Sequence, residues 1–308
     1  MQRIISAKAF APANISCIFK ICNHKNPRWT GSCGLGFTVN QGVFVKAEFS
    51  DINSIFFNGK KINFPTVQYV IDELNKEYCK KGSMNKNKKI RKNKQRIDIK
   101  IKIDITSKLP LGCGFGLSGA SALATAYALN KLLSLKKSRK ELAILAHIAE
   151  VKNKTGLGDV INQYYGGFCL KLKPSSYFVV ELLPIRNIDV YCRCFKELDT
   201  KSVITNPTLK KSINQSAKRA LKKIRILIKN NKTKSNKKIE FGDIVKISKH
   251  FAAESGLLKD MKTINAMNCI EKNNGNASMI MLGNSVFSDI PFTGSIRLKI
   301  TSRGARLL

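Results

Sequence analysis

Glycine and serine residues are concentrated in one short stretch of this 308-residue chain, residues 109–122, which reads LPLGCGFGLSGASA. Glycine lets backbone N–H groups approach a ligand closely, and the first turn of a helix leaves N–H groups unpaired with a partial positive charge. The stretch runs directly into an alanine- and leucine-rich pattern that predicts a helix. A glycine turn before a helix commonly binds phosphate. We therefore expect a phosphate- or nucleotide-binding loop here.

Two common nucleotide motifs do not fit this loop. It lacks the lysine of a Walker A motif, which excludes a standard P-loop. It also does not open the chain, as the first strand and turn of a dinucleotide-binding fold usually do. The glycine loop therefore has to be interpreted together with the residues that follow it.

Two acidic residues follow the loop at a spacing that suits nucleotide chemistry. Asp159 lies in a Gly-x-Gly-Asp turn, which displays a carboxylate, and Glu150 lies near the end of the preceding predicted helix. With a loop hydroxyl they suit a magnesium nucleotide, because Mg²⁺ prefers oxygen ligands and keeps several waters. Two simpler interpretations stay open: Asp159 as a helix N-cap and Glu150 as an exposed helix charge.

The composition is that of a folded protein with a strong basic excess. Hydrophobic residues make up 43% of the chain, enough for a core in one or two domains. No apolar run is long enough to span a membrane, and no signal-peptide pattern opens the sequence, so we expect a cytoplasmic protein. Nine scattered cysteines without a Cys-x-x-Cys pair, beside three histidines, are expected to be reduced thiols and not a zinc site.

The net charge of +35 raises the question of nucleic acid as a partner. Basic residues are densest at 80–96 and 210–238, yet the first run has no aromatic residue after Tyr78 for base stacking. Lysine also accompanies asparagine and isoleucine throughout, as in a global compositional bias. We expect solvated loops and helix faces, and no nucleic-acid partner. Weak RNA contact or attraction of anionic substrates stays as the alternative.

Periodicity predicts α and β elements around the glycine loop. Residues 97–105 alternate between isoleucine and polar residues, which predicts a half-buried strand leading into the loop. Ser138, with Glu141 three residues later, predicts the start of a helix over 139–152. The glycine-punctuated segment 30–37 is not expected to form a long regular element. Other expected elements are strands at 2–10, 43–49, 168–173, 177–183 and 188–195, helices at 66–79, 120–132 and 160–165, a helical region at 206–258 and a loop at 80–96.

Four segments together resemble the GHMP small-molecule kinases, which include galacto-, homoserine, mevalonate and phosphomevalonate kinases. The loop Pro110-x-x-x-Gly-Phe-Gly-Leu-Ser-Gly-Ala is similar to the second motif of the family. Residues 155–159 (TGLGD) with 165–167 (YGG) are similar to the segment that carries its catalytic aspartate. Residues 11–14 (APAN) resemble its N-terminal motif, and residues 281–285 (MLGNS) occupy the place of its third glycine motif. The matches follow the family order and span nearly the whole chain.

Within the family, the details are most similar to the archaeal-type pantoate kinases of coenzyme A synthesis. The similarity rests on residues 30–37 (TGSCGLGF), 114–120 (GFGLSGA) and 281–287 (MLGNSVF). Two positions depart from the pattern. Many family members carry lysine, and the pantoate subgroup histidine, where Asn14 stands, and the subgroup usually carries arginine where Cys33 stands. Arg28 could supply the missing cation, although a solvated surface arginine is the simpler interpretation.

The resemblance implies a two-domain α+β fold, with a βαβ-type N-terminal domain over residues 1–180 and a ferredoxin-like C-terminal domain over 181–308. It implies ATP-dependent phosphorylation of (R)-pantoate to 4-phosphopantoate, with ATP and Mg²⁺ as cofactors. It leaves both a monomer and a homodimer open. Asp159 is then the catalytic residue, and Ser118 and Glu150 hold the metal. The expected ATP-binding residues are Pro110, Gly112, Gly114, Phe115, Gly116, Leu117, Ser118, Gly119 and Ala120. The expected substrate-binding residues are Asn14, Arg28, Thr30, Ser32, Gly283 and Asn284.

Two other functions stay open at this point. One is a kinase of the same fold acting on another small alcohol, such as mevalonate, homoserine or a sugar; segment 28–37, expected to line the acceptor pocket, would decide between them. The other is a degenerate fold used as a basic RNA-binding or regulatory module. The presence of Ser118, Glu150 and Asp159 together argues against that module, because binding alone does not need all three.

Overall fold

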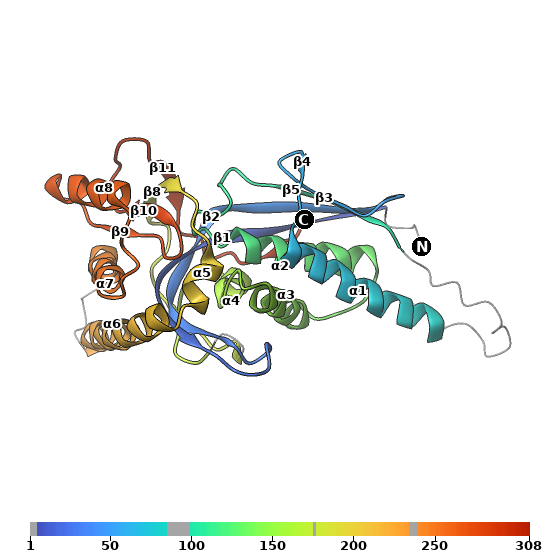
Figure 1. Cartoon of the computed structure of the whole chain (residues 1–308), viewed down its shortest axis with the longest axis horizontal. Coiled ribbons are helices and arrows are strands. Elements are labelled where there is room, and N and C mark those ends of the chain that lie inside the picture. The colour runs from blue at the N-terminus through green and yellow to red at the C-terminus, as the bar shows by residue number, and fades with distance from the viewer. Residues whose placement is uncertain (1–4, 85–98, 175–176, 234–238) are drawn as a thin grey trace.

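The chain forms two β-sheets with helices packed beside each of them (Figure 1). This computed structural model describes residues 5–84, 99–174, 177–233 and 239–308. The larger sheet has the order β12-β1-β2-β5-β3-β4, with β6 paired to β2 and β7 paired to β6, and the smaller has the order β11-β8-β10-β9. The larger sheet is made of β1 (Ser6–Cys22), β2 (Gly31–Phe49), β3 (Ser54–Phe57), β4 (Lys60–Lys61), β5 (Ile101–Thr106), β6 (Phe168–Lys171), β7 (Glu181–Leu183) and β12 (Arg306–Leu307). The smaller sheet is made of β8 (Asp189–Lys196), β9 (Ala277–Met279), β10 (Asn284–Ser288) and β11 (Ile296–Lys299).

The helices fall into two groups that follow the two sheets (Figure 1). Four helices lie along one face of the larger sheet: α1 (Pro65–Met84), α2 (Leu117–Leu132), α3 (Arg139–Asn153) and α4 (Asp159–Tyr165). The others are α5 (Thr200–Thr205), α6 (Pro207–Thr233), α7 (Phe241–Glu254) and α8 (Met261–Lys272). Helix α7 packs on β9 and α8 on β9 and β10, while α6 and α7 also contact β1. The long strand β1 therefore connects the two halves of the molecule.

Helix α2 is the centre of the first half. It packs on β1 and β2 and is flanked by α1, α3 and α4. Its alanines are fully buried, among them Ala120, Ala124 and Ala128. A helix buried on all sides needs small side chains where its neighbours come close, which explains its alanine-rich sequence. Because the glycine loop runs straight into α2, this packing fixes the position of the loop.

Strand β2 corrects one expectation. Residues 31–37 belong to the long strand β2, which starts at Gly31 and pairs with β1 along its length. Its glycines serve close approach between strands: a side chain at Gly34 would collide with the carbonyl of Ile18. The pairing also shifts register between Ser16 and Ile18. The glycines therefore allow the two strands to pair closely despite the register shift, and they do not mark turns. Glycines in turns and glycines in such a strand pair look the same in the sequence alone.

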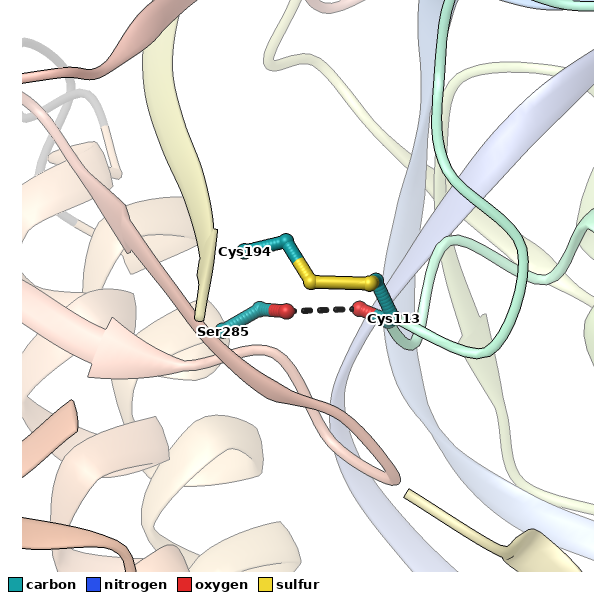
Figure 2. The surroundings of a disulfide bond; sticks show 3 residues. All are labelled: Cys113, Cys194 and Ser285. Atoms are coloured by element: carbon teal, nitrogen blue, oxygen red, sulfur yellow. Dashed lines mark hydrogen bonds between the residues drawn. A yellow bond between two sulfur atoms is a disulfide. The ribbon is translucent and has the colours of Figure 1, made fainter. Parts of the chain in front are cut away.

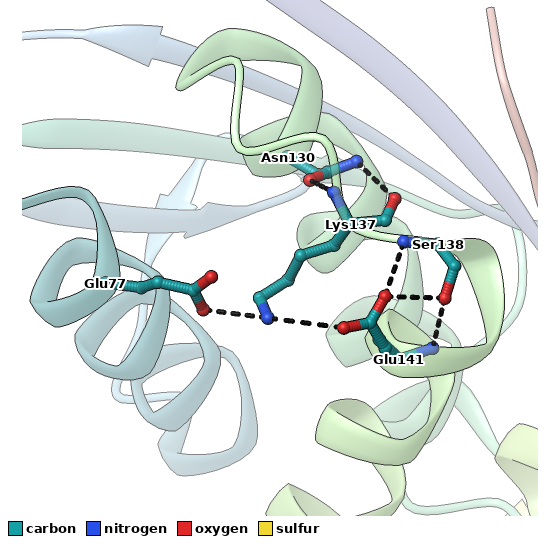
Figure 3. Close-up of polar contacts among 5 residues, drawn as sticks. All are labelled: Glu77, Asn130, Lys137, Ser138 and Glu141. Carbon is teal, nitrogen blue, oxygen red and sulfur yellow. Dashed lines mark hydrogen bonds and ion pairs between the residues drawn. The ribbon is translucent and has the colours of Figure 1, made fainter. Parts of the chain in front are cut away.

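The predicted start of α3 is confirmed in detail (Figure 3). The backbone N–H of Glu141 donates to the Ser138 hydroxyl at 3.2 Å, and the N–H of Ser138 donates to the Glu141 carboxylate at 2.8 Å. Lys137 beside the cap reaches Glu77 of α1 at 2.8 Å and Glu141 at 3.8 Å. The cap thus starts α3 and also connects it to α1.

Two boundaries near the basic run differ from expectation. Helix α1 continues to Met84, so the loop expected at 80–96 does not begin at residue 80. Residues 80–84 read KKGSM and contain no proline; Gly82 costs only about 1 kcal/mol in a helix, so the helix continues through them. Residues 85–96, and the first two residues of the strand expected at 97–105, lie outside the described residues. Within the described chain that strand begins at Ile101.

We propose a domain boundary near residue 180. The smaller sheet and helices α5 to α8 all follow it in the sequence. Strands β7 and β12 also follow it but pair into the larger sheet.

None of the described helices has the length and apolar character needed to cross a membrane.

Candidate functional site

The glycine loop lies between β5 and α2 and presents its backbone. Gly116, the N-cap of α2, has a left-handed φ of 62°, which glycine adopts without strain. The first hydrogen bond inside the helix is donated by Ala120 N–H to the Gly116 carbonyl. The N–H groups of residues 117–119 therefore have no partner within the helix, which is the arrangement that binds phosphate oxygens.

The expected ATP-binding residues divide into three groups by their exposure. Phe115, Leu117 and Ala120 are buried in the core, so they hold the loop in place. Pro110 and Gly112 are exposed, so they lie on the open side of the loop. Gly114, Gly116 and Ser118 are half-buried between them, and the Ser118 hydroxyl lies 3.1 Å from that of Thr66.

A disulfide joins the glycine loop to the smaller sheet (Figure 2). Cys113 of the loop is bonded to Cys194 of β8, and Ser285 of β10 donates a hydrogen bond to the Cys113 carbonyl at 2.8 Å. The expectation that all cysteines are reduced thiols is therefore wrong for this pair. A separation of 81 residues hid the pairing, because the two cysteines meet only once the halves are folded.

The Glu150 carboxyl group is enclosed between two glycines. A β-carbon at Gly119 would lie 2.8 Å from it, and one at Gly156 would lie 2.5 Å from its Oε1. Glu150 is fully buried, and no described residue makes a well-formed hydrogen bond to either carboxyl oxygen. Burial raises its pKa well above the usual range, and nearby Asp159 raises it further. Lys171 and the backbone N–H of Val160, which is near the carboxyl group but makes no well-formed hydrogen bond, lower it. A buried carboxyl without donors is a position for a cation.

Asp159 begins α4 and lies against the glycine loop. A β-carbon at Gly116 would come within 3.1 Å of the Asp159 side chain. Its Oδ1 accepts hydrogen bonds from the Asn14 amide at 2.6 Å and from the Ser16 hydroxyl at 3.2 Å. Burial raises its pKa, and Lys171 and these two donors oppose the rise. The carboxylate is therefore held in one orientation beside the phosphate-binding turn.

Asn14 is fully buried and acts within the protein framework. Its amide donates to Asp159 and to Ser16, and its side-chain oxygen accepts from Asn162 of α4 at 2.8 Å. Its backbone N–H donates to the Phe115 carbonyl of the glycine loop at 3.0 Å. Asn14 thus connects β1, α4 and the loop, which is a positioning geometry for Asp159.

The other expected substrate-binding residues are scattered. Arg28 is exposed, and its guanidinium lies 5.9 Å from the centre of the Trp29 ring. The Thr30 hydroxyl is engaged within its own loop by His24. Ser32 lines the small cavity beside Asp159. Gly283 packs against Cys113 of the glycine loop.

Asn284 begins β10 and pairs with Lys196 of β8. Of the six expected substrate-binding residues, only Ser32 lines the cavity. Asn14 borders the site through its hydrogen bond to Asp159.

Lys171 is the site residue that sequence reasoning missed. It ends β6, is buried, and lines the same cavity as Asp159, Ser16 and Ser32. Its ammonium donates to the Gly158 carbonyl at 2.8 Å. Burial lowers its pKa, and Asp159 opposes that shift. The available signal was a lysine at the end of the apolar run 168–171, since lysine is almost never buried without a partner.

The donor set fits a magnesium nucleotide. Asp159 is half-buried and adds to the cost of ionising the fully buried Glu150, a cost that a divalent cation would relieve. The described residues contain no cluster of three or more histidine, cysteine or acidic side chains, so no all-protein metal cage is present there. Mg²⁺ typically takes one or two carboxylates together with waters and substrate phosphates. The residues present match that pattern.

Comparison with known proteins agrees with this geometry. A family model for the N-terminal domain of GHMP kinases matches residues 78–167. A pantoate kinase from Methanocaldococcus jannaschii is 35% identical over 280 residues, covering 90% of each chain. A solved phosphotransferase related to the CoA biosynthesis pathway superposes with a TM-score of 0.76 at 24% identity, covering 98% of both chains. Mevalonate-3-kinase from Thermoplasma acidophilum, solved with mevalonate 3-phosphate and ADP, gives a TM-score of 0.66 at 13% identity, covering 99% of this chain and 98% of its own.

The fold and the arrangement of glycine loop and carboxylates are those of a small-molecule kinase. The chain belongs to the GHMP kinases and, within them, to the family of that pantoate kinase. The expected two-domain α+β GHMP fold is thereby confirmed.

The buried Glu150 carboxyl predicts an unusual pH dependence of stability. A carboxyl whose pKa is raised in the folded state costs stability once pH exceeds its unfolded pKa, and the cost grows until pH passes the folded pKa. Replacing it with a neutral amide (Glu150→Gln) should leave stability near wild type at pH 4 and raise it progressively above pH 5. Urea unfolding of the unliganded protein from pH 4 to 8 measures this, with exposed Glu240→Gln as control. Parallel curves for wild type and Glu150→Gln would contradict the prediction.

Proposed function

We propose that this protein transfers the γ-phosphoryl group of ATP to the primary hydroxyl of pantoate, giving 4-phosphopantoate and ADP for coenzyme A synthesis. The observation that carries the proposal is a held carboxylate, Asp159, between a phosphate-binding helix N-terminus and a cavity that contains a buried cation, Lys171. An acceptor that bears both a hydroxyl and a carboxylate complements these two groups. The relationship to a pantoate kinase supports the same acceptor.

ATP binds to the glycine loop in this proposal. The backbone N–H groups from 114 to 119 donate to the phosphate oxygens, and the loop is held from below by the buried Phe115 and Leu117. Glu150 and Ser118 would hold Mg²⁺, which supplies charge neutralisation on the transferring phosphoryl group. Glu150 can do this because its two oxygens have no well-formed hydrogen bond within the described protein.

Asp159 orients the acceptor hydroxyl and accepts its proton. Both of its hydrogen bonds in the described chain, from Asn14 and Ser16, end on Oδ1, so Oδ2 is the oxygen that we assign to the base. Burial raises the pKa of this carboxyl, which makes it a stronger base than an exposed aspartate. Phosphoryl transfer depends mainly on alignment and charge neutralisation, and alignment is worth roughly 7–11 kcal/mol of barrier. Holding the hydroxyl is thus the larger part of the role.

Lys171 binds the pantoate carboxylate. Lys171 lines the small cavity beside Asp159, so an acceptor that reaches both side chains would place its hydroxyl at Asp159 and its carboxylate at Lys171. A charge-assisted hydrogen bond in a buried site discriminates strongly against acceptors without the anion.

The expectations of a cytoplasmic location and of a homodimer stay predictions.

The acceptor is tested directly with a panel of alcohols. Pantoate, mevalonate, homoserine and galactose are offered in parallel with ATP and Mg²⁺. For each alcohol the rate of ADP formation is measured, and the phosphorylated product is identified by mass spectrometry. We expect the highest kcat/KM for pantoate and a negligible rate for galactose, which has no carboxylate. Preference for another acceptor would redirect the assignment within the same fold. Salt-sensitive RNA binding without any transfer would indicate a binding module instead.

Asp159→Asn tests the catalytic assignment. The amide keeps the shape of the side chain but cannot accept the proton, so turnover should fall about 10²- to 10⁴-fold. ATP affinity should stay within about twofold, because the glycine loop is intact. Single-turnover kinetics and nucleotide titration separate the two effects, with exposed Asp51→Asn as the control. Near-normal turnover of Asp159→Asn would refute the role.

Lys171→Met tests acceptor recognition. Loss of a charge-assisted hydrogen bond, worth about 1.5–3 kcal/mol, should raise the KM for pantoate about tenfold to hundredfold and leave the KM for ATP unchanged. Lys173→Met, an exposed lysine two residues later, is the matched control. Steady-state kinetics with each substrate varied in turn is the measurement. An equal rise in both KM values would point to a general structural defect.

A further inference from the structure

A second pair of cysteines lies near the acceptor end of the site. Cys22 ends β1 and Cys33 lies near the start of β2, and their sulfur atoms are 3.7 Å apart. In the strand pairing, Lys20 is opposite Cys33, so Cys22 and Cys33 are diagonal neighbours on one face. A disulfide needs a sulfur separation of about 2.05 Å, so a small approach of the side chains would close this pair.

The surroundings of Cys22 favour the thiolate. It is half-buried, and hydrogen bonding with Cys33 lowers its pKa to about 6. Positive charge from Lys20 and from Lys210 of α6 acts in the same direction. The same hydrogen bond raises the pKa of Cys33. The contact between the two sulfur atoms therefore favours ionisation of Cys22 and disfavours ionisation of Cys33.

Three other thiols of the described chain lack this combination. Cys17, Cys169 and Cys192 are buried, and burial raises the pKa of each of them. A buried neutral thiol is inert, whereas an accessible thiolate reacts with disulfides. Cys22 has access to solvent, a lowered pKa and a second sulfur within reach. These are the features of a thiol poised next to a resolving cysteine.

The pair is coupled to the acceptor cavity through strand β6. The Cys33 thiol donates a weak hydrogen bond to the Leu172 carbonyl at 3.7 Å, directly after Lys171. The neighbouring Gly34 is paired with Lys171, and the preceding Ser32 lines the cavity. Movement of Cys33 toward Cys22 therefore acts on the two strands that carry Ser32 and Lys171.

We propose that Cys22 and Cys33 form a thiol-modification site that takes a low-molecular-weight disulfide, and that its oxidation weakens acceptor binding. The Cys22 thiolate attacks one sulfur of the disulfide RSSR, which forms a Cys22–SR mixed disulfide and releases RS⁻. Cys33 then gives up its proton and attacks the Cys22 sulfur, expelling a second RS⁻. The two protein sulfurs lose two electrons and form the Cys22–Cys33 disulfide, and RSSR is reduced to two RS⁻. One RS⁻ takes the Cys33 proton and the other is protonated by water, giving two RSH.

Intact-mass spectrometry with peptide mapping tests the site. The full chain is treated with oxidised glutathione at pH 7 without denaturant. Wild type should form the Cys22–Cys33 disulfide, while Cys33→Ser should stop at one glutathione on Cys22. Cys22→Ser should lose the fast reaction at both positions, and exposed Cys269→Ser, as the matched control, should react like wild type. We expect modification of Cys22 to be about tenfold faster than that of Cys269, because the contact with Cys33 and the charges of Lys20 and Lys210 stabilise the Cys22 thiolate.

Kinetics tests the effect, and this arm rests on the proposed function. Oxidised wild type should show a raised KM for pantoate with an unchanged KM for ATP, and reduction should restore it. Cys22→Ser should keep wild-type kinetics with or without the oxidant. First modification at Cys269, or no closure of the pair, would overturn the site. Closure without a change in the KM for pantoate would overturn the coupling. Failure of the untreated protein to phosphorylate pantoate would refute the proposed function and leave the mass result to decide the thiol site.

Discussion

Two carboxyl groups packed against the start of helix α2, Glu150 fully buried and Asp159 half-buried, are the constraint on which this structure depends. Glu150 and Asp159 both lie against the glycine loop, and burial disfavours the charge on each of them. Gly119 and Gly156 lack side chains where the Glu150 carboxyl group has to fit. A protein retains such a costly arrangement when a ligand repays the cost. The fold therefore holds a charge arrangement that is completed by a cation and phosphate.

The glycine loop is held from both halves of the molecule. From one side, the buried helix α2 and the backbone of Asn14 fix it against the larger sheet. From the other, Cys194 and Ser285 attach Cys113 to the smaller sheet. A loop attached on both sides can present N–H groups in a fixed geometry, and such preorganisation is what phosphoryl transfer requires. The cost of this arrangement is that the loop cannot move without moving both sheets or breaking the disulfide.

Local sequence signals predicted the elements that depend on local physics. The start of α3 follows from Ser138 and Glu141, and the start of α2 follows from the glycine turn before it. Segment 30–37 was misinterpreted because its glycines are needed for close packing against the neighbouring strand β1. No local sequence pattern reveals which strand will be the neighbour. The Cys113–Cys194 bond was missed for the same reason. In the site, Asp159 lies in a segment that resembles a family motif, and Glu150 was chosen as a carboxylate near the end of the preceding predicted helix. Lys171 had neither signal and needed the fold to bring it to Asp159.

Lys171 also explains how the acceptor site keeps a positive charge despite two departures from the family pattern. Asn14 and Cys33 are neutral where the family resemblance leads us to expect cations. Cys33 and Lys171 lie on paired strands, close enough that each affects the pKa of the other. In the proposed site, Lys171 on β6 can therefore supply the positive charge that a cation at residue 33 would supply. The exposed basic residues that make up most of the +35 charge cannot replace it, because screening limits their field to about 8–10 Å. Surface charge can attract anions in general, but only a buried cation beside the base can align one.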